Sequence, residues 1–279
     1  MNWLLDYLLK IKPNFDEGQK LNWLYPLYEA TETILFSTDA KTKSAPHIRD
    51  SIDIKRVMIL VVVALIPCYV FGAINVGYQN ALSFGLERTW IENLIFGAKT
   101  IIPIIVVTFV AGAFWEILFA IVRKHEISEG FLVTCALIPL TMPPSIPLWQ
   151  LFIATSFGIV IGKEIFGGTG RNIFDPALTA RVFLFFAYPA QLSGDAVWTA
   201  VDGYTGATML SVAADGGVLA LEQSVTWMQS FVGTIHGSIV ETSTVAILMG
   251  GSLLLLTRIA SWRIIIGVLV GSALLSTLF

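Results

Sequence analysis

The stretch VMILVVVALIPCYVFGAINV, residues 57–76, decides the fold class of this chain. It contains no charged residue, and about 20 mostly apolar residues are enough to cross a bilayer as a helix. A later apolar stretch is interrupted by TMPPSIP (141–147), and interrupted elements are typical of broken helices that line a cavity. We therefore predict an all-α polytopic membrane protein, a multi-span helical bundle with short and broken helices. The further predicted spans are 101–122, 131–149, 151–166, 177–192, 242–257 and 264–279.

The overall composition agrees with a membrane environment. Of the 279 residues, 55% are hydrophobic and 13% are charged, whereas ordinary soluble domains carry about 25% charged residues. The two cysteines, Cys68 and Cys135, both lie in apolar stretches, which argues against a disulfide framework or a cysteine-ligated metal cluster. The lipid bilayer is therefore an expected partner, and nucleic acid is not.

The distribution of positive charge predicts the orientation. Residues 1–54 carry scattered charges without an apolar run, so we expect a cytoplasmic or interfacial extension, not a signal peptide, ahead of a transmembrane domain at 55–279. If the extension is cytoplasmic and the spans alternate, the inner segments hold fifteen Lys and Arg residues and the outer segments hold two. The loop 193–241 holds none, so we predict that it faces outward.

Glu116 stands out because it lies inside the predicted span 101–122. A carboxylate within a span is costly and is a functional hypothesis by default. Gly112 precedes it by one helical turn on the same face, which predicts a notch beside the acid. Lys163 and Glu164 end a later span, and the simplest interpretation of Lys163 is that its ammonium reaches the membrane interface.

Two glycine features concern the local backbone. The segment FGGTGRNIFDPALTAR (166–181) is either a ligand-binding loop at a helix N-terminus or a tight turn with Asp175 as the N-cap, and the residues leave both open. The glycines spaced four apart at 158/162 and at 267/271 predict close helix packing.

The outward loop contains DGYTGAT (202–208). Gly203 and Gly206 permit a tight turn that presents the hydroxyl of Thr208. Turn chemistry alone indicates an ordinary outward turn. A hydroxyl without a neighbouring His or Lys is not an activated nucleophile, so a hydrolase with Thr208 as its nucleophile is not expected.

Five segments resemble one family, the B subunits of the Na+-translocating NADH:quinone oxidoreductases (NqrB), across essentially the whole chain. The D subunits of the Rnf complex have a comparable threonine motif but lack an extension like residues 1–54. The segments are LYPLYEATETILFSTDAKTKSAPHIRDSIDIKR (24–56), RKHEISEGF (123–131), KEIFGGTGRNIFDPALTARVFLFFAYPAQLSGD (163–195), DGYTGATML (202–210) and IASWRIIIGVLVGSALLSTLF (259–279).

The resemblance implies a flavin on Thr208. In both families the matching threonine carries FMN through a phosphoester, which a flavin transferase forms outside the cytoplasm. Asp202, Gly206 and Ala207 would belong to the attachment motif. The resemblance also implies noncovalent riboflavin, ubiquinone as substrate, and partner subunits in a bacterial inner-membrane complex.

The resemblance extends to the acids. It links Glu116 and Glu29 to Na+ uptake and places Gly112 and Glu116 near the quinone. The family has an inverted-repeat architecture like that of urea transporters and continues through about three more spans. Because this chain ends within the apolar stretch GVLVGSALLSTLF, we expect a truncated subunit.

The implied function is electron transfer from FMN through riboflavin to ubiquinone, coupled to Na+ export. The alternatives are a subunit like RnfD in a ferredoxin:NAD oxidoreductase, and a channel like a urea transporter without a redox role.

Overall fold

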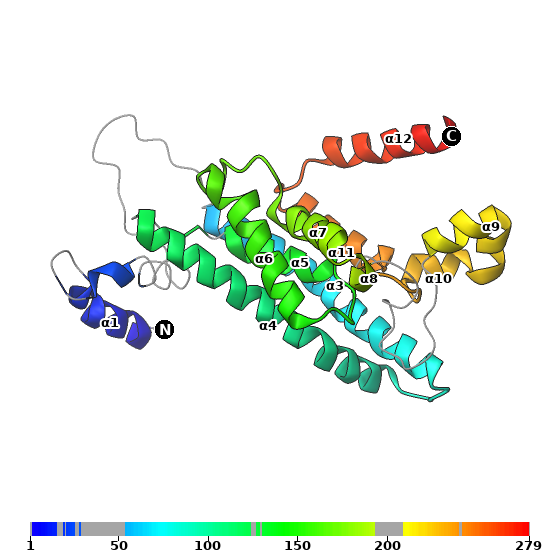
Figure 1. Ribbon diagram of the computed structural model, residues 1–279, viewed down its shortest axis with the longest axis horizontal. Helices are drawn as coiled ribbons and strands as arrows, with labels where there is room; N and C mark the ends of the chain where they lie inside the picture. Colours follow the sequence, from blue (N-terminus) through cyan, green and yellow to red (C-terminus); the bar gives the residue numbers. More distant parts are fainter. Residues whose placement is uncertain are drawn as a thin grey trace. The chain divides into compact units, whose positions relative to one another are not determined.

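A computed structural model describes residues 2–15, 19, 21–25, 28, 54–123, 127–128, 130–192, 209–239 and 242–278. Every regular element in these ranges is a helix, so the prediction of an all-helical chain is confirmed (Figure 1). The short and terminal elements are α1 (Asn2–Ile11), η1 (Lys12–Asn14), η2 (Asn22–Leu24), η3 (Glu164–Phe166), α8 (Pro189–Leu192), α9 (Met209–Ser224) and α10 (Trp227–Val232). The apolar helices are α3 (Ile54–Ser83), α4 (Trp90–Arg123), α5 (Gly130–Leu140), α6 (Leu148–Gly162), α7 (Pro176–Ala187), α11 (Thr244–Leu256) and α12 (Trp262–Leu278).

Within the described residues, three segments are long and apolar enough to cross a membrane: Arg56–Ser83, Trp90–Arg123 and Leu148–Phe166. On α4 the outward side chains Val106, Val110 and Phe114, spaced one turn apart, are exposed. An exposed apolar stripe of this kind suits contact with lipid. Together, the helices show a membrane protein.

The chain folds into two compact units. Unit 1 consists of residues 1–58, 102–139 and 146–192, and unit 2 consists of residues 59–101, 140–145 and 193–279. Both long helices, α3 and α4, contribute one segment to each unit.

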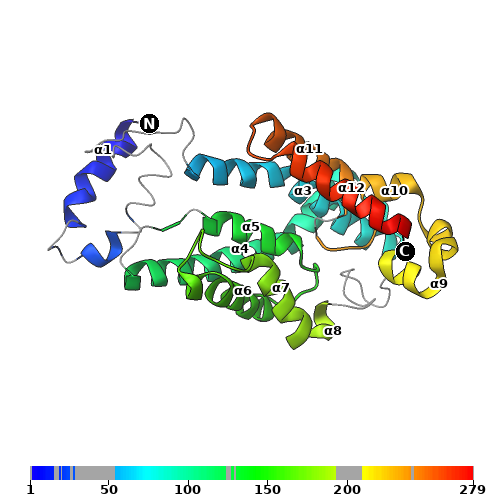
Figure 2. The ribbon, with the colours of Figure 1, turned by 90° about the horizontal axis from the view of Figure 1, so that it is seen from above.

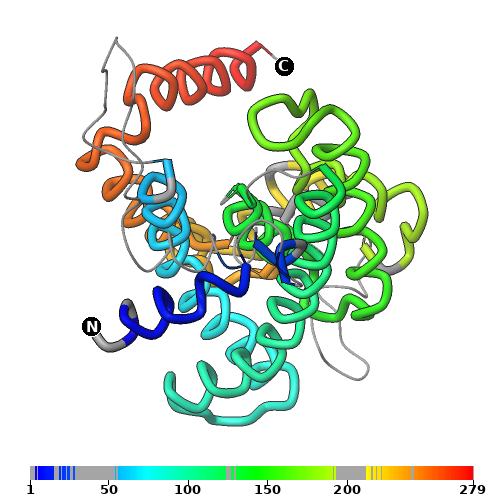
Figure 3. Tube along the Cα trace, turned by 90° about the vertical axis from the view of Figure 1, so that its left-hand side faces the viewer, coloured from blue at the N-terminus to red at the C-terminus, as the bar shows by residue number. Residues whose placement is uncertain are grey.

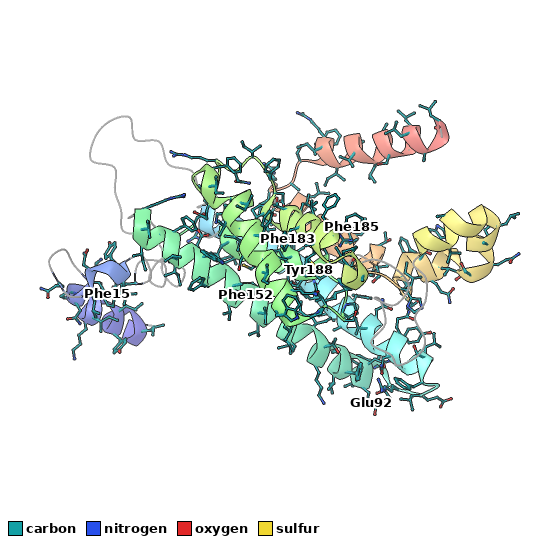
Figure 4. All side chains as sticks on the ribbon, in the orientation of Figure 1. Phe15, Glu92, Phe152, Phe183, Phe185 and Tyr188 are labelled. Atoms are coloured by element: carbon teal, nitrogen blue, oxygen red, sulfur yellow. The ribbon has the colours of Figure 1, made fainter. Side chains whose placement is uncertain are left out.

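In unit 1, α6 packs against α7, and the two helices lie side by side (Figures 1 and 3). Gly158 makes this close approach possible, because a Cβ there would overlap the carbonyl oxygen of Pro176. The packing predicted for glycines 158 and 162 is therefore confirmed. The ring of Phe183 on α7 stacks on Phe157 of α6 with centroids 4.5 Å apart, and Figure 4 labels Phe183.

In unit 2, α3 lies beside α11 (Figure 2). Gly250 of α11 is so close to α3 that an added Cβ would overlap the carbonyl oxygen of Ala64. The first turns of α4 approach α3 in the same way, since a Cβ on Gly97 would overlap the carbonyl oxygen of Ala73. Small residues thus allow helix backbones to pack closely in both units.

The segment between α10 and α11 is tied to α3 by side-chain hydrogen bonds. Asn75 donates from Nδ2 to the carbonyl oxygen of Ile235 over 2.9 Å. Gln79, one turn further along α3, donates from Nε2 to Asn75 Oδ1 over 3.3 Å. An amide side chain therefore gives the Ile235 carbonyl oxygen a hydrogen bond, which the hydrocarbon of a membrane could not supply.

Candidate functional site

Of the site residues predicted from the sequence, two lie in the part of the chain that the structure describes. These are Gly112 and Glu116, both on α4. The remaining predicted residues lie outside the described ranges: Glu29, Asp202, Gly206, Ala207 and Thr208.

Glu116 forms a buried ion pair within unit 1. Its carboxylate is 2% exposed, and Lys163 donates from Nζ to Glu116 Oε2 over 2.5 Å. The backbone N–H of Ser128, just before α5, also donates to the Glu116 carboxylate. Two separate segments of unit 1 therefore hold one acid inside the helical packing.

The interpretation that Lys163 reaches the membrane interface is wrong. Its side chain is only 3% exposed, because the ammonium turns inward to Glu116. Lys163 is the C-cap residue of α6, and the negative end of a helix dipole favours a cation there. The ion pair and the helix end together stabilise the Lys163 ammonium, which lipid or an apolar core alone would not stabilise.

A second acid shares the same lysine. Glu164 is 1% exposed, and its Oε1 lies 3.6 Å from Lys163 Nζ. Arg123, at the end of α4, donates from Nη1 to Glu164 Oε2 over 3.1 Å and from Nη2 to the Glu164 carbonyl oxygen over 2.6 Å. We call Glu116, Lys163, Glu164 and Arg123 the ion-pair network.

The ion-pair network is electrically balanced, with two acids and two bases when all four are ionised. Burial is graded along it: Arg123 is 32% exposed, whereas the other three side chains are at most 3% exposed. The Arg123 guanidinium also lies over the ring of Phe119, 4.9 Å from its centroid. The network thus runs from a partly exposed arginine to a fully buried carboxylate.

Helical spacing explains why α4 supplies both ends of the network. Glu116, Ala120 and Arg123 are spaced at i, i+4 and i+7, so they share one face of α4. Ala120 is fully buried on this face and leaves room for neighbouring segments. Seven residues correspond to about 10 Å along a helix, which is the distance between the two ends of the network along α4.

The notch predicted at Gly112 is filled by neighbouring side chains. A Cβ at Gly112 would overlap Cys135 Sγ of α5 and would lie 3.3 Å from Cδ1 of Ile159 on α6. Gly112 therefore lets α5 and α6 approach α4 one turn before Glu116. The small residue serves helix packing at this point.

The glycine-rich turn after α6 fixes the two central members of the network. The N–H of Gly168 donates to the Lys163 carbonyl oxygen over 3.2 Å, and that of Gly167 donates to the Glu164 carbonyl oxygen over 3.0 Å. Both glycines have a positive φ, 114° at Gly167 and 93° at Gly168, which side chains rarely tolerate. Their conformation directs the backbone so that Lys163 and Glu164 both turn inward.

The same segment shows the cap that one of the two interpretations of residues 166–181 predicted. Asp175 is the N-cap of α7, and its side chain accepts a hydrogen bond from the N–H of Leu178 over 2.9 Å. The helix N-terminus therefore already has its own carboxylate. The tight turn with an Asp175 cap is what the structure shows.

Sequence reasoning missed the roles of Arg123 and Glu164. One available signal was the spacing of Arg123, seven residues after Glu116 on the same helical face. The pairing with Lys163 and Glu164 needed the tertiary contact between α4 and the end of α6. Among the described residues, no group of three or more His, Cys, Asp or Glu side chains is arranged to hold a metal ion.

The sequence matches known proteins over most of its length. Residues 41–279 match the model of the NQR2, RnfD, RnfE family. The chain is 51% identical to the B subunit of the Na(+)-translocating NADH-quinone reductase from Stutzerimonas stutzeri (strain A1501), over 98% of this chain and 74% of that protein. The protein of the same name from Azotobacter vinelandii (strain DJ / ATCC BAA-1303) is 52% identical over the same shares.

A third relative of the same name, from Pseudomonas aeruginosa (strain LESB58), is 48% identical over 99% of this chain and 74% of its own length. The chain therefore spans about three quarters of the length of these relatives. The resemblance stated from sequence motifs is confirmed by these matches.

Proposed function

The chain belongs to the NQR2, RnfD, RnfE family, and from this premise we propose that it is the membrane electron-transfer subunit of a Na+-translocating NADH:ubiquinone oxidoreductase. The observation that carries the proposal is the match to relatives of that name at about half identity over 98% of the chain. Its partners would be the other subunits of the complex. It would lie in the bacterial inner membrane with its N-terminus in the cytoplasm, an orientation that the fifteen-to-two distribution of positive charge favours.

The cofactors of the proposal are covalent FMN on Thr208 and noncovalent riboflavin. When bound, the flavins would supply one-electron transfer between NADH-derived electrons and ubiquinone, coupled to Na+ export. The residues that we propose for the attachment motif are Asp202, Gly206, Ala207 and Thr208. A flavin transferase would form the phosphoester on the outer side.

The described backbone next to Thr208 is suited to a phosphate. Helix α9 begins at Met209, directly after the threonine, and its first turn contains no acidic residue. The free N–H groups and the positive end of the dipole at a helix N-terminus favour a phosphate. This geometry supports Thr208 as the attachment point.

Glu116 is the residue of unit 1 that we propose for the quinone and Na+ steps, with Gly112 in its vicinity and Glu29 as a second acid for Na+ uptake. Its support is the buried carboxylate of the ion-pair network. Trp115, the preceding residue, has a buried indole N–H without a hydrogen-bond acceptor among the described residues. A donor of this kind suits the carbonyl oxygen of a quinone.

The overall architecture of the proposal is an inverted repeat like that of urea transporters. The broken and shortened helices α5, α6 and α7 support it, because such helices line binding sites in transporters with internal repeats.

One experiment tests the redox proposal against a channel without a redox role. The chain is co-expressed with a flavin transferase, denatured in SDS and inspected for flavin fluorescence in the gel. We expect fluorescence from the native sequence and from Thr199→Ala, a threonine of the same predicted loop outside the motif, and none from Thr208→Ala. Fluorescence that persists in Thr208→Ala would refute the attachment site, and a colourless native chain would favour the channel.

A subunit like RnfD is the second candidate, because the matching family model also includes that protein. It would carry the same flavin. Electron transfer from NADH to ubiquinone in the assembled complex, with Na+ dependence, distinguishes the two.

A further inference from the structure

Lys163 is the member of the ion-pair network that contacts Glu116 directly, and the proposed function gives it no role. Its ammonium lies between two buried carboxylates, 2.5 Å from Glu116 Oε2 and 3.6 Å from Glu164 Oε1. A buried carboxylate keeps its charge only if a partner compensates the loss of water. Lys163 supplies that compensation to Glu116 across the contact between two helices.

Arg123 determines how Lys163 divides its charge. The guanidinium makes two hydrogen bonds to Glu164, one to the carboxylate and one to the backbone carbonyl. Glu164 is therefore already neutralised from the other side. Lys163 therefore pairs mainly with Glu116, in agreement with the distances from its Nζ, which is nearer to Glu116 Oε2 than to Glu164 Oε1.

The backbone of Lys163 is fixed as firmly as its side chain. Its N–H donates to the Ile159 carbonyl oxygen at the end of α6, and its own carbonyl accepts from the N–H groups of Phe166 and Gly168. The preceding residue, Gly162, packs against α7. A lysine with both ends held cannot follow a displaced carboxylate far, so it sets where that carboxylate sits.

We propose that Lys163 is the positioning residue of Glu116: it holds the carboxylate in one place inside unit 1 for the reaction of the complex. The glycine turn at 167–170 and the Arg123–Glu164 pair are its support. This inference rests on the proposed function, in which Glu116 acts at the quinone step.

The test is a set of four variants in the assembled complex: Glu116→Gln, Lys163→Met, the double variant and Lys163→Arg. NADH oxidation with ubiquinone-1 gives kcat and KM, and each rate is divided by the covalent flavin measured in the gel. Lys99→Met, on the exposed face of α4, is the matched control. Division by flavin content removes losses that arise only from poor assembly.

Misplacement of a reacting group by about 1 Å costs roughly 100-fold in rate. We therefore expect Glu116→Gln and Lys163→Met each to lower kcat by roughly 10- to 100-fold. The double variant should be no slower than the slower single variant, because each single change already disrupts the same Glu116–Lys163 ion pair. Lys163→Arg, which keeps the charge, should recover a substantial part of kcat, and Lys99→Met should match the native sequence.

Native kcat and KM per flavin in Lys163→Met would overturn the inference. So would a double variant whose loss is the product of the two single losses. If Lys163→Met does not assemble, Glu116→Gln is compared with Glu116→Gln/Lys163→Gln, which leaves no unpaired buried charge. Equal rates in this pair support the inference, and a slower double variant overturns it.

The outcomes separate this inference from the proposed function. If the native complex reduces quinone and Glu116→Gln is unaffected, Glu116 has no role at that step; the inference fails, while flavin attachment and quinone reduction stand. If the native complex carries no covalent flavin and reduces no quinone, the proposed function itself fails, and the inference fails with it.

Discussion

The replacement Lys163→Met should destabilise the chain more than any exposed lysine replacement, because it leaves Glu116 as an unpaired charge in unit 1. At an effective dielectric constant of 20, Coulomb's law gives about 7 kcal/mol for charges 2.5 Å apart and about 5 kcal/mol for charges 3.6 Å apart. Most of this attraction is offset by desolvation of the charges. The expected net loss on removal of one partner is about 3–5 kcal/mol.

Removal of both charges should recover most of the stability that Lys163→Met loses. The double variant Glu116→Gln/Lys163→Met leaves Glu164 paired with Arg123, so no buried charge is uncompensated. Replacement of a whole buried pair by uncharged residues is often neutral or stabilising, by up to about 4 kcal/mol. We therefore expect the double variant to be clearly more stable than Lys163→Met alone.

The assay is unfolding by SDS titration in mixed detergent micelles, followed by tryptophan fluorescence. Lys99→Met, which changes an exposed side chain, should lie within about 0.5 kcal/mol of the native sequence. A loss below about 1 kcal/mol for Lys163→Met, or a double variant as unstable as the sum of the two single variants, would refute the reasoning.

The other predictions concern the effects of packing and of pH on stability, which the same unfolding assay measures. Gly158→Ala should cost about 1–3 kcal/mol because the new Cβ would overlap the Pro176 carbonyl oxygen, whereas Gly267→Ala meets nothing within 4 Å and should gain about 0.5–1 kcal/mol. Equal effects of the two would contradict the packing described for α6 and α7. Burial lowers the pKa of His236, so the unfolded chain takes up a proton that the folded chain resists. Stability should therefore fall as the pH drops below about 6.5, and His236→Gln should reduce that fall; an unchanged pH profile would show that His236 does not contribute.

The helical class of the chain could be predicted from sequence because apolar length alone specifies a membrane helix. The stretch 57–76 lies inside α3, and the proline-interrupted stretch 131–149 divides between α5 and the start of α6. Single prolines, Pro67 and Pro103, lie inside the continuous helices α3 and α4, whereas the three prolines of residues 143–147 fall where α5 and α6 are separated, so their local clustering marks the break. Local rules were sufficient for these elements.

The ion-pair network could be predicted only in part. The cost of Glu116 in a span was evident, but its partner is 47 residues away and depends on which helices become neighbours. The same limit applies to the glycine pairs: 158/162 pack against α7, whereas nothing described lies near a Cβ added at 267 or 271. Spacing identifies a surface that can pack closely, and tertiary structure decides whether it does. Thr208 stays a prediction, because it lies outside the described residues.

The distance in sequence between Glu116 and Lys163 also has a consequence for biogenesis. At a synthesis rate of about 5–20 residues per second, Lys163 leaves the ribosome about 2–10 s after Glu116. During that time α4 must either wait at the translocon or enter lipid with its carboxylate unneutralised. Insertion of α4 together with α6, as a preassembled pair, avoids exposing the acid to hydrocarbon. The order of synthesis therefore favours delayed release of α4 until its lysine has arrived.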